Sequence, residues 1–323
     1  MYIVTGGAGM IGSAMVWRLN QEGIDDIWVV DHLGSSEKWK NLAGRKFSEY
    51  LPREEFLERL LRDDLPAGID AVFHMGACSS TTERDVDYLF RNNLEYSKTV
   101  ATYALSRGIR FIHASSAATY GNGSQGFGDD AGTLEALRPL NAYGYSKHLF
   151  DLWAHKTRAL KNMAALKFFN VYGPNEYHKG DMRSVVVKGY AEILQTGHLR
   201  LFASDHPDYA DGGQMRDFVY VKDCAAVMWW LSQNQDANGI FNLGTGNART
   251  WNALAASLFD AMGLEERITY IPMPESLRGK YQNFTQADMR RLAKVECPVV
   301  MHTLEEGVRD YVRGYLMSDD PFL

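Results

Sequence analysis

The stretch Ile3-Val-Thr-Gly6-Gly-Ala-Gly9-Met-Ile-Gly12 decides the fold of this 323-residue chain. A short β-branched run leads into glycines at three-residue spacing, and a helical pattern follows from Met10. Because glycine has no Cβ, the backbone amides of such a turn can approach a pyrophosphate at the helix N-terminus, where the dipole favours anions. Asp31 ends the next strand pattern about 20 residues on, where a ribose hydroxyl lies in dinucleotide-binding folds. The segment therefore predicts a dinucleotide site.

Short apolar runs alternate with longer helical patterns through the first half of the chain. The expected strands are Tyr2–Thr5, Ile27–Asp31, Ala71–Met75, Arg110–Ser115 and Leu166–Asn170. The expected helices are Met10–Glu22, Thr82–Arg107 and Tyr143–Leu160. This alternation is typical of a parallel sheet with both faces covered. It predicts an α/β protein: a Rossmann-type doubly wound parallel sheet with a smaller α/β substrate-binding domain.

The second half of the chain has a less regular pattern. Phe218–Val221 and Ile240–Leu243 are expected to return to the main sheet, and Ser124–Arg138 to form a loop over its carboxyl edge. The expected dinucleotide-binding domain is 1–170 plus 217–243. The expected substrate-binding domain is 171–216 plus 244–323.

Composition excludes several classes of function. The net charge is −6 with the two signs mixed, so no basic stripe indicates nucleic acid. No apolar run reaches the roughly 20 residues of a membrane span. The Met1 strand pattern predicts that no signal peptide precedes the fold. Cys78, Cys224 and Cys297 are few and far apart, which favours a reducing cytoplasm over disulfides or a metal site.

The residues near Asp31 bear on the choice of nucleotide. Asp31 alone favours the unphosphorylated ribose of NAD. His32, Lys38, Lys40 and Arg53 are cations that can face a 2′-phosphate, although Lys40 is equally well explained as a solvated surface charge. We expect NADP, with NAD as the less favoured cofactor, and Lys38 and Arg53 as phosphate contacts.

The stretch Tyr143-Gly-Tyr-Ser-Lys147 places a phenol and an ammonium one helical turn apart, on the same helix face. A tyrosine of pKa near 10 is a poor base at neutral pH, and a nearby lysine cation lowers that pKa. The strand Arg110–Ala114 delivers Ser116 to the sheet's carboxyl edge, where its hydroxyl can bind a substrate alcohol or ketone. Ser116, Tyr143 and Lys147 are therefore the expected catalytic set.

Several motifs together carry a family resemblance. They are Gly6–Gly12, Ser116, Tyr143 with Lys147, Arg216-Asp-Phe-Val-Tyr-Val and Phe241-Asn-Leu-Gly-Thr-Gly246. On these the chain is identified as a member of the extended short-chain dehydrogenase/reductase superfamily, whose members mostly act on nucleotide sugars. The dehydratases of that superfamily carry Thr-Asp-Glu after the serine-bearing strand. This chain has Ser116-Ala117-Ala118 there, which argues against dehydration.

A closer resemblance rests on further motifs. They are His74–Thr82, Ala114–Gly121, Asn170–Pro174, His178–Gly180 and Gly279–Asp288. They resemble the ADP-L-glycero-D-manno-heptose 6-epimerase family, which makes a heptose nucleotide for the inner core of bacterial lipopolysaccharide. The resemblance implies inversion at C6″ of the ADP-heptose: hydride leaves for bound NADP, a 6″-ketone forms, and hydride returns to the other face.

The resemblance also implies roles for individual residues. Lys179 matches the family's second acid/base group beside Tyr143, its pKa lowered by desolvation or by a cationic neighbour such as His178. Asp181 is an acid that could instead pair with Lys179. The implied cofactor contacts are Gly6, Gly9, Met10, Ile11, Gly12, Asp31, His32, Lys38, Arg53, Met75, Gly76, Ala77, Cys78, Ser79, Asn92, Lys147, Val171 and Lys179. The implied substrate contacts are Ser116, Asn170, Asp181, Lys188, Phe202, Ala203, Ser204, Asp205, Arg216 and Tyr281.

Two other functions stay open. A UDP-hexose 4-epimerase shares the serine, tyrosine and first lysine but has no need of Lys179. A catalytically silent dinucleotide-binding sensor or scaffold needs no intact Ser116, Tyr143 and Lys147. The resemblance further implies a homo-oligomer, with five subunits in the family's relatives.

Overall fold

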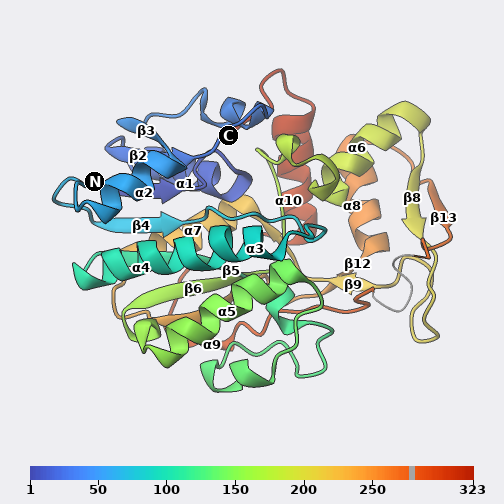
Figure 1. Cartoon of the computed structure of the whole chain (residues 1–323). Coiled ribbons are helices and arrows are strands. Elements are labelled where there is room, and N and C mark those ends of the chain that lie inside the picture. Colours follow the sequence, from blue (N-terminus) through green and yellow to red (C-terminus); the bar gives the residue numbers. More distant parts are fainter. Residues whose placement is uncertain (276–280) are drawn as a thin grey trace.

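The computed structural model describes residues 1–275 and 281–323, and its centre is one sheet of seven parallel strands (Figure 1). The strand order is β11-β6-β5-β4-β1-β2-β3, and every neighbouring pair is parallel. These strands are β1 Tyr2–Thr5, β2 Ile27–Asp31, β3 Glu49–Pro52, β4 Ala71–His74, β5 Arg110–Ser116, β6 Met163–Phe168 and β11 Gly239–Leu243. The predicted Rossmann-type α/β fold is confirmed.

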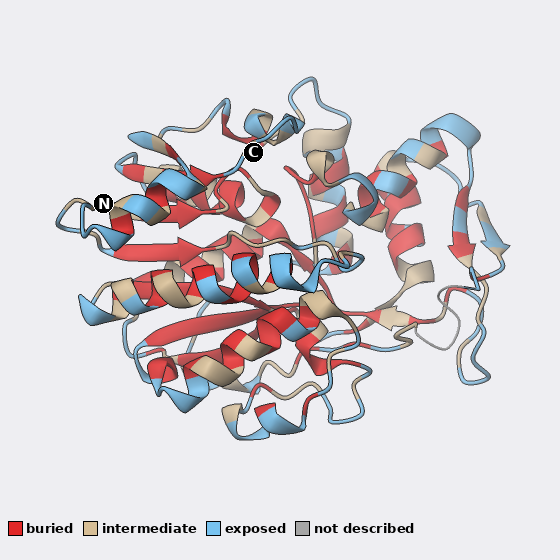
Figure 2. Cartoon of the chain, viewed as in Figure 1, coloured by how far each residue is buried: buried red, intermediate tan, exposed pale blue. Residues whose placement is uncertain are grey.

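Helices cover both faces of this sheet and bury two apolar cores (Figure 2). Within β1, Val4 belongs to one core and Ile3 to the other, as the alternation of side chains along a strand requires. In the first core, α1 Met10–Gln21 and α7 Val221–Gln233 pack against the sheet, and the core continues into the helices of the smaller part of the chain. The helices of the second core are α2 Arg53–Leu61, α4 Tyr96–Ser106 and α5 Ala142–Lys156.

A smaller part of the chain lies beside the carboxyl edge of the sheet (Figure 1). Its two-stranded sheets pair β7 Asn170–Tyr172 with β10 Phe218–Tyr220, β9 Met215–Arg216 with β12 Arg249–Thr250, and β8 Leu199–Phe202 with β13 Ile268–Ile271. Its longer helices are α6 Val185–Thr196, α8 Trp251–Met262 and α10 Leu304–Tyr311. The short α-helices of the molecule are α3 Val86–Leu89 and α9 Arg290–Lys294.

Short helical turns of other types complete the description. The 3₁₀ turns are η1 Glu37–Leu42, η3 Ala117–Tyr120, η4 Ala131–Ala136, η5 Ala159–Lys161 and η6 Tyr177–Met182. The π-helical turns are η2 Phe90–Glu95 and η7 Val312–Leu316.

The expected placement of Phe218–Val221 in the main sheet is wrong. The amide of Phe169 donates to the carbonyl of Leu243 at the end of the sheet, and the chain then leaves it. From Asn170 the backbone pairs with β10 in a separate two-stranded sheet. Ile240–Leu243 does belong to the main sheet, within β11.

Other element boundaries also differ from expectation. Strand β3 was missed because only Leu51 is buried at this sheet edge, so no apolar pattern marks it. The strand expected at Leu166–Asn170 begins at Met163 and ends at Phe168. The helix expected from Thr82 begins at Val86 and is interrupted by η2.

The glycine turn after β1 depends on close backbone approach. Gly6 has φ of +64°, and a Cβ there would lie 2.6 Å from the Cα of Gly76, which follows β4. A Cβ on Gly12 would lie 2.1 Å from the carbonyl oxygen of Gly6. Side chains at either position would push α1 away from the sheet, so the turn requires glycine.

Candidate active site

A cavity of about 600 Å³ lies at the carboxyl edge of the sheet, against the first turn of α1. It is lined by most of the predicted cofactor residues: Gly6, Gly9, Met10, Ile11, Gly12, Asp31, His32, Lys38, Met75, Gly76, Ala77, Cys78, Ser79, Lys147 and Lys179. The first amides of an α-helix have no intrahelical acceptor, so those of Met10, Ile11 and Gly12 are available to an anion. The glycine cradle and these free amides fit a dinucleotide pyrophosphate.

A second cavity of about 510 Å³ adjoins the first and extends toward the smaller part of the chain. The predicted residues that line it are Ile11, Ser79, Ser116, Tyr143, Asn170, Val171 and Lys179. Six residues line both cavities: Ile11, Ser79, Tyr143, Phe168, Lys179 and Met182. Tyr143 and Lys179 are the ionisable groups at this junction.

Helix α5 holds Tyr143 and Lys147 next to the end of β5. The side chain of Asn141 caps α5 by accepting from the amide of Gly144 at 2.8 Å. A Cβ on Gly144 would lie 2.8 Å from the carbonyl oxygen of Ala118, so the glycine lets the helix pack close to η3. The Nζ atom of Lys147 donates to the carbonyl of Ala114 at 2.7 Å. This bond fixes the buried lysine against β5.

Burial sets the pKa values of the catalytic pair. It raises the pKa of Tyr143, and the Ser116 hydroxyl acts in the opposite direction. Burial also lowers the pKa of Lys147 to about 8, while Asp151 and Cys78 oppose the shift. The expectation of a lowered Tyr143 pKa is therefore wrong, because burial outweighs the contact that favours the phenolate. The Lys147 ammonium is instead bonded to a backbone carbonyl.

Lys179 lies on η6, half buried at the junction of the two cavities. Its Nζ lies 3.9 Å from the sulfur of Met10, at the start of α1. Burial lowers the pKa of Lys179, and Glu176 acts in the opposite direction. The buried carboxylate of Glu176 accepts from the Ser184 hydroxyl at 2.7 Å, which ties η6 to the start of α6. The amine is thus held in an environment that favours its neutral form.

The neighbours of Lys179 differ from expectation. Burial, followed by the charges of Lys179 and Lys38, lowers the pKa of His178 to about 4. His178 is therefore neutral near pH 7 and is not the cationic neighbour that we expected. Asp181 is exposed and is not among the causes of the Lys179 pKa shift, so the alternative in which these two residues pair is not supported.

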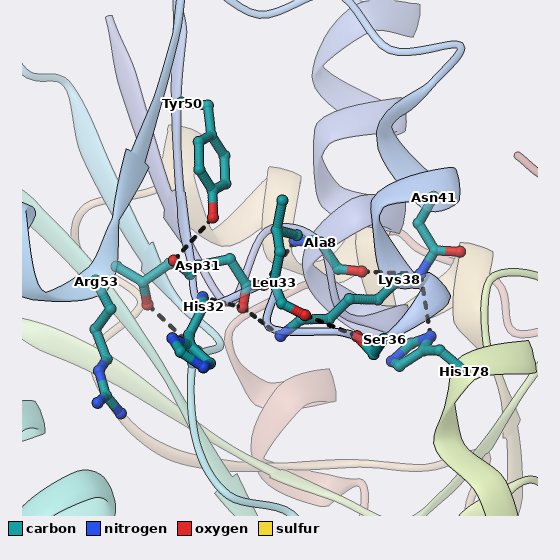
Figure 3. Close-up of polar contacts among 12 residues, drawn as sticks. Ala8, Asp31, His32, Leu33, Ser36, Lys38, Asn41, Tyr50, Arg53 and His178 are labelled. Atoms are coloured by element: carbon teal, nitrogen blue, oxygen red, sulfur yellow. Dashed lines mark hydrogen bonds and ion pairs between the residues drawn. The ribbon is translucent and has the colours of Figure 1, made fainter.

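The Asp31 carboxylate is enclosed by donors from the protein itself (Figure 3). One oxygen accepts from the amide of Ala8 at 2.8 Å. The other accepts from the amide of His32 and from Nζ of Lys38, each at 2.6 Å. Three of its roughly four acceptor positions are occupied, so a ribose hydroxyl has little left to bind.

Arg53 and Asn92 lie around a third cavity of about 270 Å³ that adjoins the Asp31 end of the first. The Arg53 guanidinium donates to the side-chain oxygen of Asn92. On its solvent-exposed side it also donates to the carboxylate of Glu54. His32 and Lys38 line the same cavity. Three basic side chains therefore converge beside Asp31.

A buried arginine, Arg216, lies beside Trp251, which lines the second cavity. Arg216 is 7% exposed, and its guanidinium lies 4.9 Å from the ring centre of Tyr281 and 5.8 Å from that of Trp251. Phe202 packs edge-on against Tyr281 with ring centres 6.4 Å apart. Burial lowers the pKa of Arg216, and among the described residues no carboxylate forms an ion pair with it. Such a guanidinium suits a diphosphate.

Some predicted contacts lie outside the two main cavities. Asp181 and Lys188 are exposed, and Nζ of Lys188 donates to the carbonyl of Asp181 at 3.3 Å. Ala203, Ser204 and Asp205 follow β8 at the edge of the smaller part. Val171 was predicted to contact the cofactor but lines the second cavity, because it lies on β7, beyond the main sheet. Of the Gly279–Asp288 motif, residues 279 and 280 lie outside the described residues.

Comparison with known proteins identifies the family. Residues 2–244 match the family described as the NAD dependent epimerase/dehydratase family. The chain belongs to this family.

Its relatives narrow the assignment. The ADP-L-glycero-D-manno-heptose-6-epimerase of Nitratidesulfovibrio vulgaris (strain DP4) is 63% identical over 323 residues, which cover 100% of both chains. The protein of the same name from Fusobacterium nucleatum is 46% identical over 332 residues, again covering 100% of both. The crystal structure of the Helicobacter pylori ADP-L-glycero-D-manno-heptose-6-epimerase aligns with a TM-score of 0.81 and 26% identity, over 97% of this chain and 95% of that one. The expected membership of the ADP-heptose 6-epimerase family is confirmed.

Sequence reasoning missed several residues that line the cavities of this epimerase. Trp251, Gln282 and Thr285 line the second cavity, and Asn41 lies beside the first. Asn41 donates to the carbonyls of Ala8 and Asn175, so it joins the glycine turn to the segment before η6. A single tryptophan or asparagine carries no recognisable signal of a binding site in one sequence.

The described part of the epimerase was also searched for membrane-spanning helices and for groups of metal ligands. None of its described helices combines the length and apolar character that a membrane crossing needs. Within residues 1–275 and 281–323, no three His, Cys, Asp or Glu side chains are grouped as metal ligands would be.

Proposed function

We propose that this protein interconverts the C6″ epimers of ADP-glycero-D-manno-heptose, with Tyr143 and Lys179 as the two acid/base groups. The observation that carries this is the junction of the two cavities, which Tyr143 and Lys179 both line. Inversion of one carbon needs a proton donor or acceptor on each face of it. The two residues come from separate elements, α5 and η6, and can therefore approach a sugar from different sides.

A nicotinamide dinucleotide in the first cavity would supply the hydride acceptor and donor for C6″. The chain's own residues orient the sugar and manage its proton. The neutral amine of Lys179 or the phenolate of Tyr143 takes the proton of the C6″ alcohol, and the Ser116 hydroxyl donates to the oxygen that becomes the ketone. The burial that lowers the pKa of Lys179 supports this role, because it keeps an amine able to accept a proton.

The finer choice between NADP and NAD follows from the surroundings of Asp31. Its carboxylate is bonded to Ala8, His32 and Lys38, and so is poorly placed to bind a ribose 2′-hydroxyl. Lys38 and Arg53 add positive charge on the same side, around the third cavity. These contacts support NADP as the cofactor.

Division of labour between the two parts of the chain is also a proposal. Residues 1–170 plus 217–243 would bind the dinucleotide, and residues 171–216 plus 244–323 would bind the ADP-heptose, with Arg216 on the diphosphate. We further propose a cytoplasmic homo-oligomer that serves lipopolysaccharide inner-core synthesis, as the family resemblance implies. Sedimentation velocity tests the assembly: a monomer at micromolar concentration would contradict it.

The central experiment is incubation of the purified protein with ADP-D-glycero-D-manno-heptose without added reductant. We expect conversion to the L-glycero epimer, followed by NMR of the heptose. In deuterated water C6″ should stay unlabelled, because its hydrogen returns as hydride; solvent label there would indicate deprotonation beside a carbonyl instead. Conversion of a UDP-hexose but not ADP-heptose would favour the 4-epimerase reading, and turnover of neither would favour a silent dinucleotide-binding protein.

A further inference from the structure

Lys147 belongs to a cluster of three buried charged side chains. Lys147 is 2% exposed, Asp151 0% and Lys167 1%. Lys147 and Asp151 lie one turn apart on α5, and Lys167 extends from β6. The Nζ of Lys167 lies 3.7 Å from Oδ2 of Asp151, and the Ser115 hydroxyl donates to the same oxygen at 2.8 Å. The Asp151 carboxylate therefore pairs with Lys167, and Lys147 precedes it by four residues on the same face of α5.

Burying charged groups destabilises the fold unless opposite charges or hydrogen bonds compensate for the lost hydration. An ion without a partner in a protein interior loses its hydration, and an amine in that position becomes neutral instead. The bond to the Ala114 carbonyl gives Lys147 one acceptor but no opposite charge. Among the described groups that act on the charge of Lys147, Asp151 is the only carboxylate.

We propose that Asp151 is a positioning residue for the reaction: its buried carboxylate holds Lys147 as an ammonium ion, bonded to Ala114, next to Tyr143. Lys167 competes for the same carboxylate and so limits how strongly Asp151 acts on Lys147. This inference rests on the proposed function, because it gives the Lys147 charge a role at Tyr143.

The other groups around the cluster do not supply the missing charge. Facing Lys147 are Cys78 from the loop after β4, His74 from β4 and His113 from β5. Burial, followed by the charge of Lys147, lowers the pKa of His74 to about 3 and that of His113 well below its ordinary value, so both rings are neutral.

Lys167 has neighbours of its own. Its Nζ lies 4.2 Å from the ring centre of Tyr120, and Asp129 acts on it from the loop before η4. His148 faces it from α5, and burial together with the Lys167 charge lowers the pKa of His148 to about 4. Asp129 and Tyr120 both bond Asn242 of β11, so these two neighbours of Lys167 are held at the edge of the main sheet.

The sign of the effect on activity follows from these contacts. Burial lowers the pKa of Lys147 and Asp151 raises it. Removing the Asp151 charge should therefore let Lys147 lose its proton at a lower pH. Removing the Lys167 charge should leave the Asp151 carboxylate to Lys147 alone, and Lys147 should then keep its proton to the same or a higher pH.

The experiment compares Asp151→Asn and Lys167→Met with the parent enzyme. Asparagine keeps the shape of aspartate and can still accept from Ser115, so folding is preserved as far as one substitution allows. Asp310→Asn is the matched control, since Asp310 pairs with Lys222 at 2.6 Å and lines neither main cavity. The readouts are the pH dependence of kcat for ADP-heptose and, independently, the ¹³Cε NMR titration of Lys147, assigned with Lys147→Met.

In Asp151→Asn we expect the alkaline limb of kcat and the Lys147 titration to move down by about one pH unit, with KM little changed. At pH 8 this corresponds to a roughly fivefold loss of kcat. In Lys167→Met the alkaline limb of kcat and the Lys147 titration should stay at the parent pH or shift to a higher pH. In Asp310→Asn neither should shift. A Lys147 titration that is unchanged in Asp151→Asn overturns the proposal, and so does a downward shift in Lys167→Met. The NMR titration reads Lys147 without turnover, so a failure of the proposed function would appear only in the kinetics.

Discussion

The Lys38 ammonium lies 2.6 Å from the carboxylate of Asp31, inside the cavity wall that a dinucleotide ribose would face (Figure 3). An aspartate at this position normally favours NAD. Here the ion pair neutralises the Asp31 carboxylate, and the surrounding surface is basic. The acid is neutralised by its own neighbour, and Arg53 and His32 stand beside it. Cofactor preference therefore depends on the whole cluster.

Lys38→Met should reverse that preference. Without the ammonium, the Asp31 carboxylate repels a 2′-phosphate, and one charge-assisted hydrogen bond is worth about 1.5–3 kcal/mol. We expect NADPH affinity to fall roughly 10- to 100-fold, measured by fluorescence titration. NADH affinity should change little or improve.

Lys40→Met is the matched control for Lys38→Met, because Lys40 pairs with Glu37 and lines neither main cavity. Equal losses in the two variants would mean that the effect is general surface charge and not contact with the phosphate.

Lys179→Met should abolish epimerisation while leaving the dinucleotide site intact. Methionine keeps the length and apolar packing near Met10 but cannot accept a proton. Loss of a positioned acid/base group costs about 10²–10⁴-fold in rate, and we expect kcat to fall within that range. NADPH binding, measured by fluorescence, should stay within a fewfold of the parent.

The exposed Lys188→Met on α6 controls for loss of a positive charge near η6 and should keep the parent kcat. Near-normal turnover in Lys179→Met would contradict the two-base scheme and favour a 4-epimerase type of site.

Arg216→Gln should weaken substrate binding more than it slows the chemical step. The buried guanidinium lies between Tyr281 and Trp251 and is proposed to bind the diphosphate. Its removal eliminates charge-assisted hydrogen bonds that exist before and during the reaction, so KM should rise at least tenfold with a smaller change in kcat. Steady-state kinetics with ADP-heptose measures both. Arg200→Gln, which breaks an exposed pair with Glu192, should leave KM unchanged; a KM that stays constant in Arg216→Gln would place the diphosphate elsewhere.

The main sheet and the dinucleotide turn could be predicted from the sequence because their signals are local. Gly6, Gly9 and Gly12 follow a strand and open a helix, and the structure shows the close contacts that require glycine at Gly6 and Gly12. Tyr143 and Lys147 lie on one helix, so their neighbourhood follows from the helix period alone. These are short-range rules that one sequence can carry.

The predictions that were wrong concern features that depend on contacts between segments distant in the sequence. The neutral state of His178 arises from burial against Asn41 and the cationic neighbours Lys179 and Lys38, which no spacing reveals. β10 lies outside the main sheet because it pairs with β7, which follows Phe169 after the end of β6. Strand β3 has too few buried positions to show a period. Such features follow from tertiary packing, which decides both burial and pairing.

Gly12→Ala should disrupt dinucleotide binding through the backbone. A Cβ at this position would lie 2.1 Å from the Gly6 carbonyl oxygen, a distance that no rotamer can relieve. The first turn of α1 must shift, and its amides then no longer point at the pyrophosphate site. We expect NADPH affinity to fall at least tenfold and the melting temperature to drop. Gly44→Ala, whose Cβ would meet nothing within 4 Å, should change neither quantity; unchanged binding in Gly12→Ala would show that the turn tolerates a side chain.

Buried His74 should make the protein acid-sensitive. Its ring bonds the Thr5 hydroxyl at 2.8 Å and the Ser97 hydroxyl at 2.9 Å, and burial, followed by the Lys147 charge, lowers its pKa to about 3 from an ordinary value of 6.5. Between these two pH values His74 is protonated in the unfolded chain but neutral in the folded protein. The free energy of unfolding should therefore fall as pH drops below 6.5, with a slope of about 1.4 kcal/mol per pH unit from this one site. Urea unfolding at a series of pH values from 4.5 to 7 measures the slope, and His74→Gln, which keeps a hydrogen-bonding side chain without a titrating ring, should remove about one proton's share of it. A slope that is the same in parent and variant would mean that His74 carries its proton in the folded state, and the acid sensitivity would then have to come from other groups.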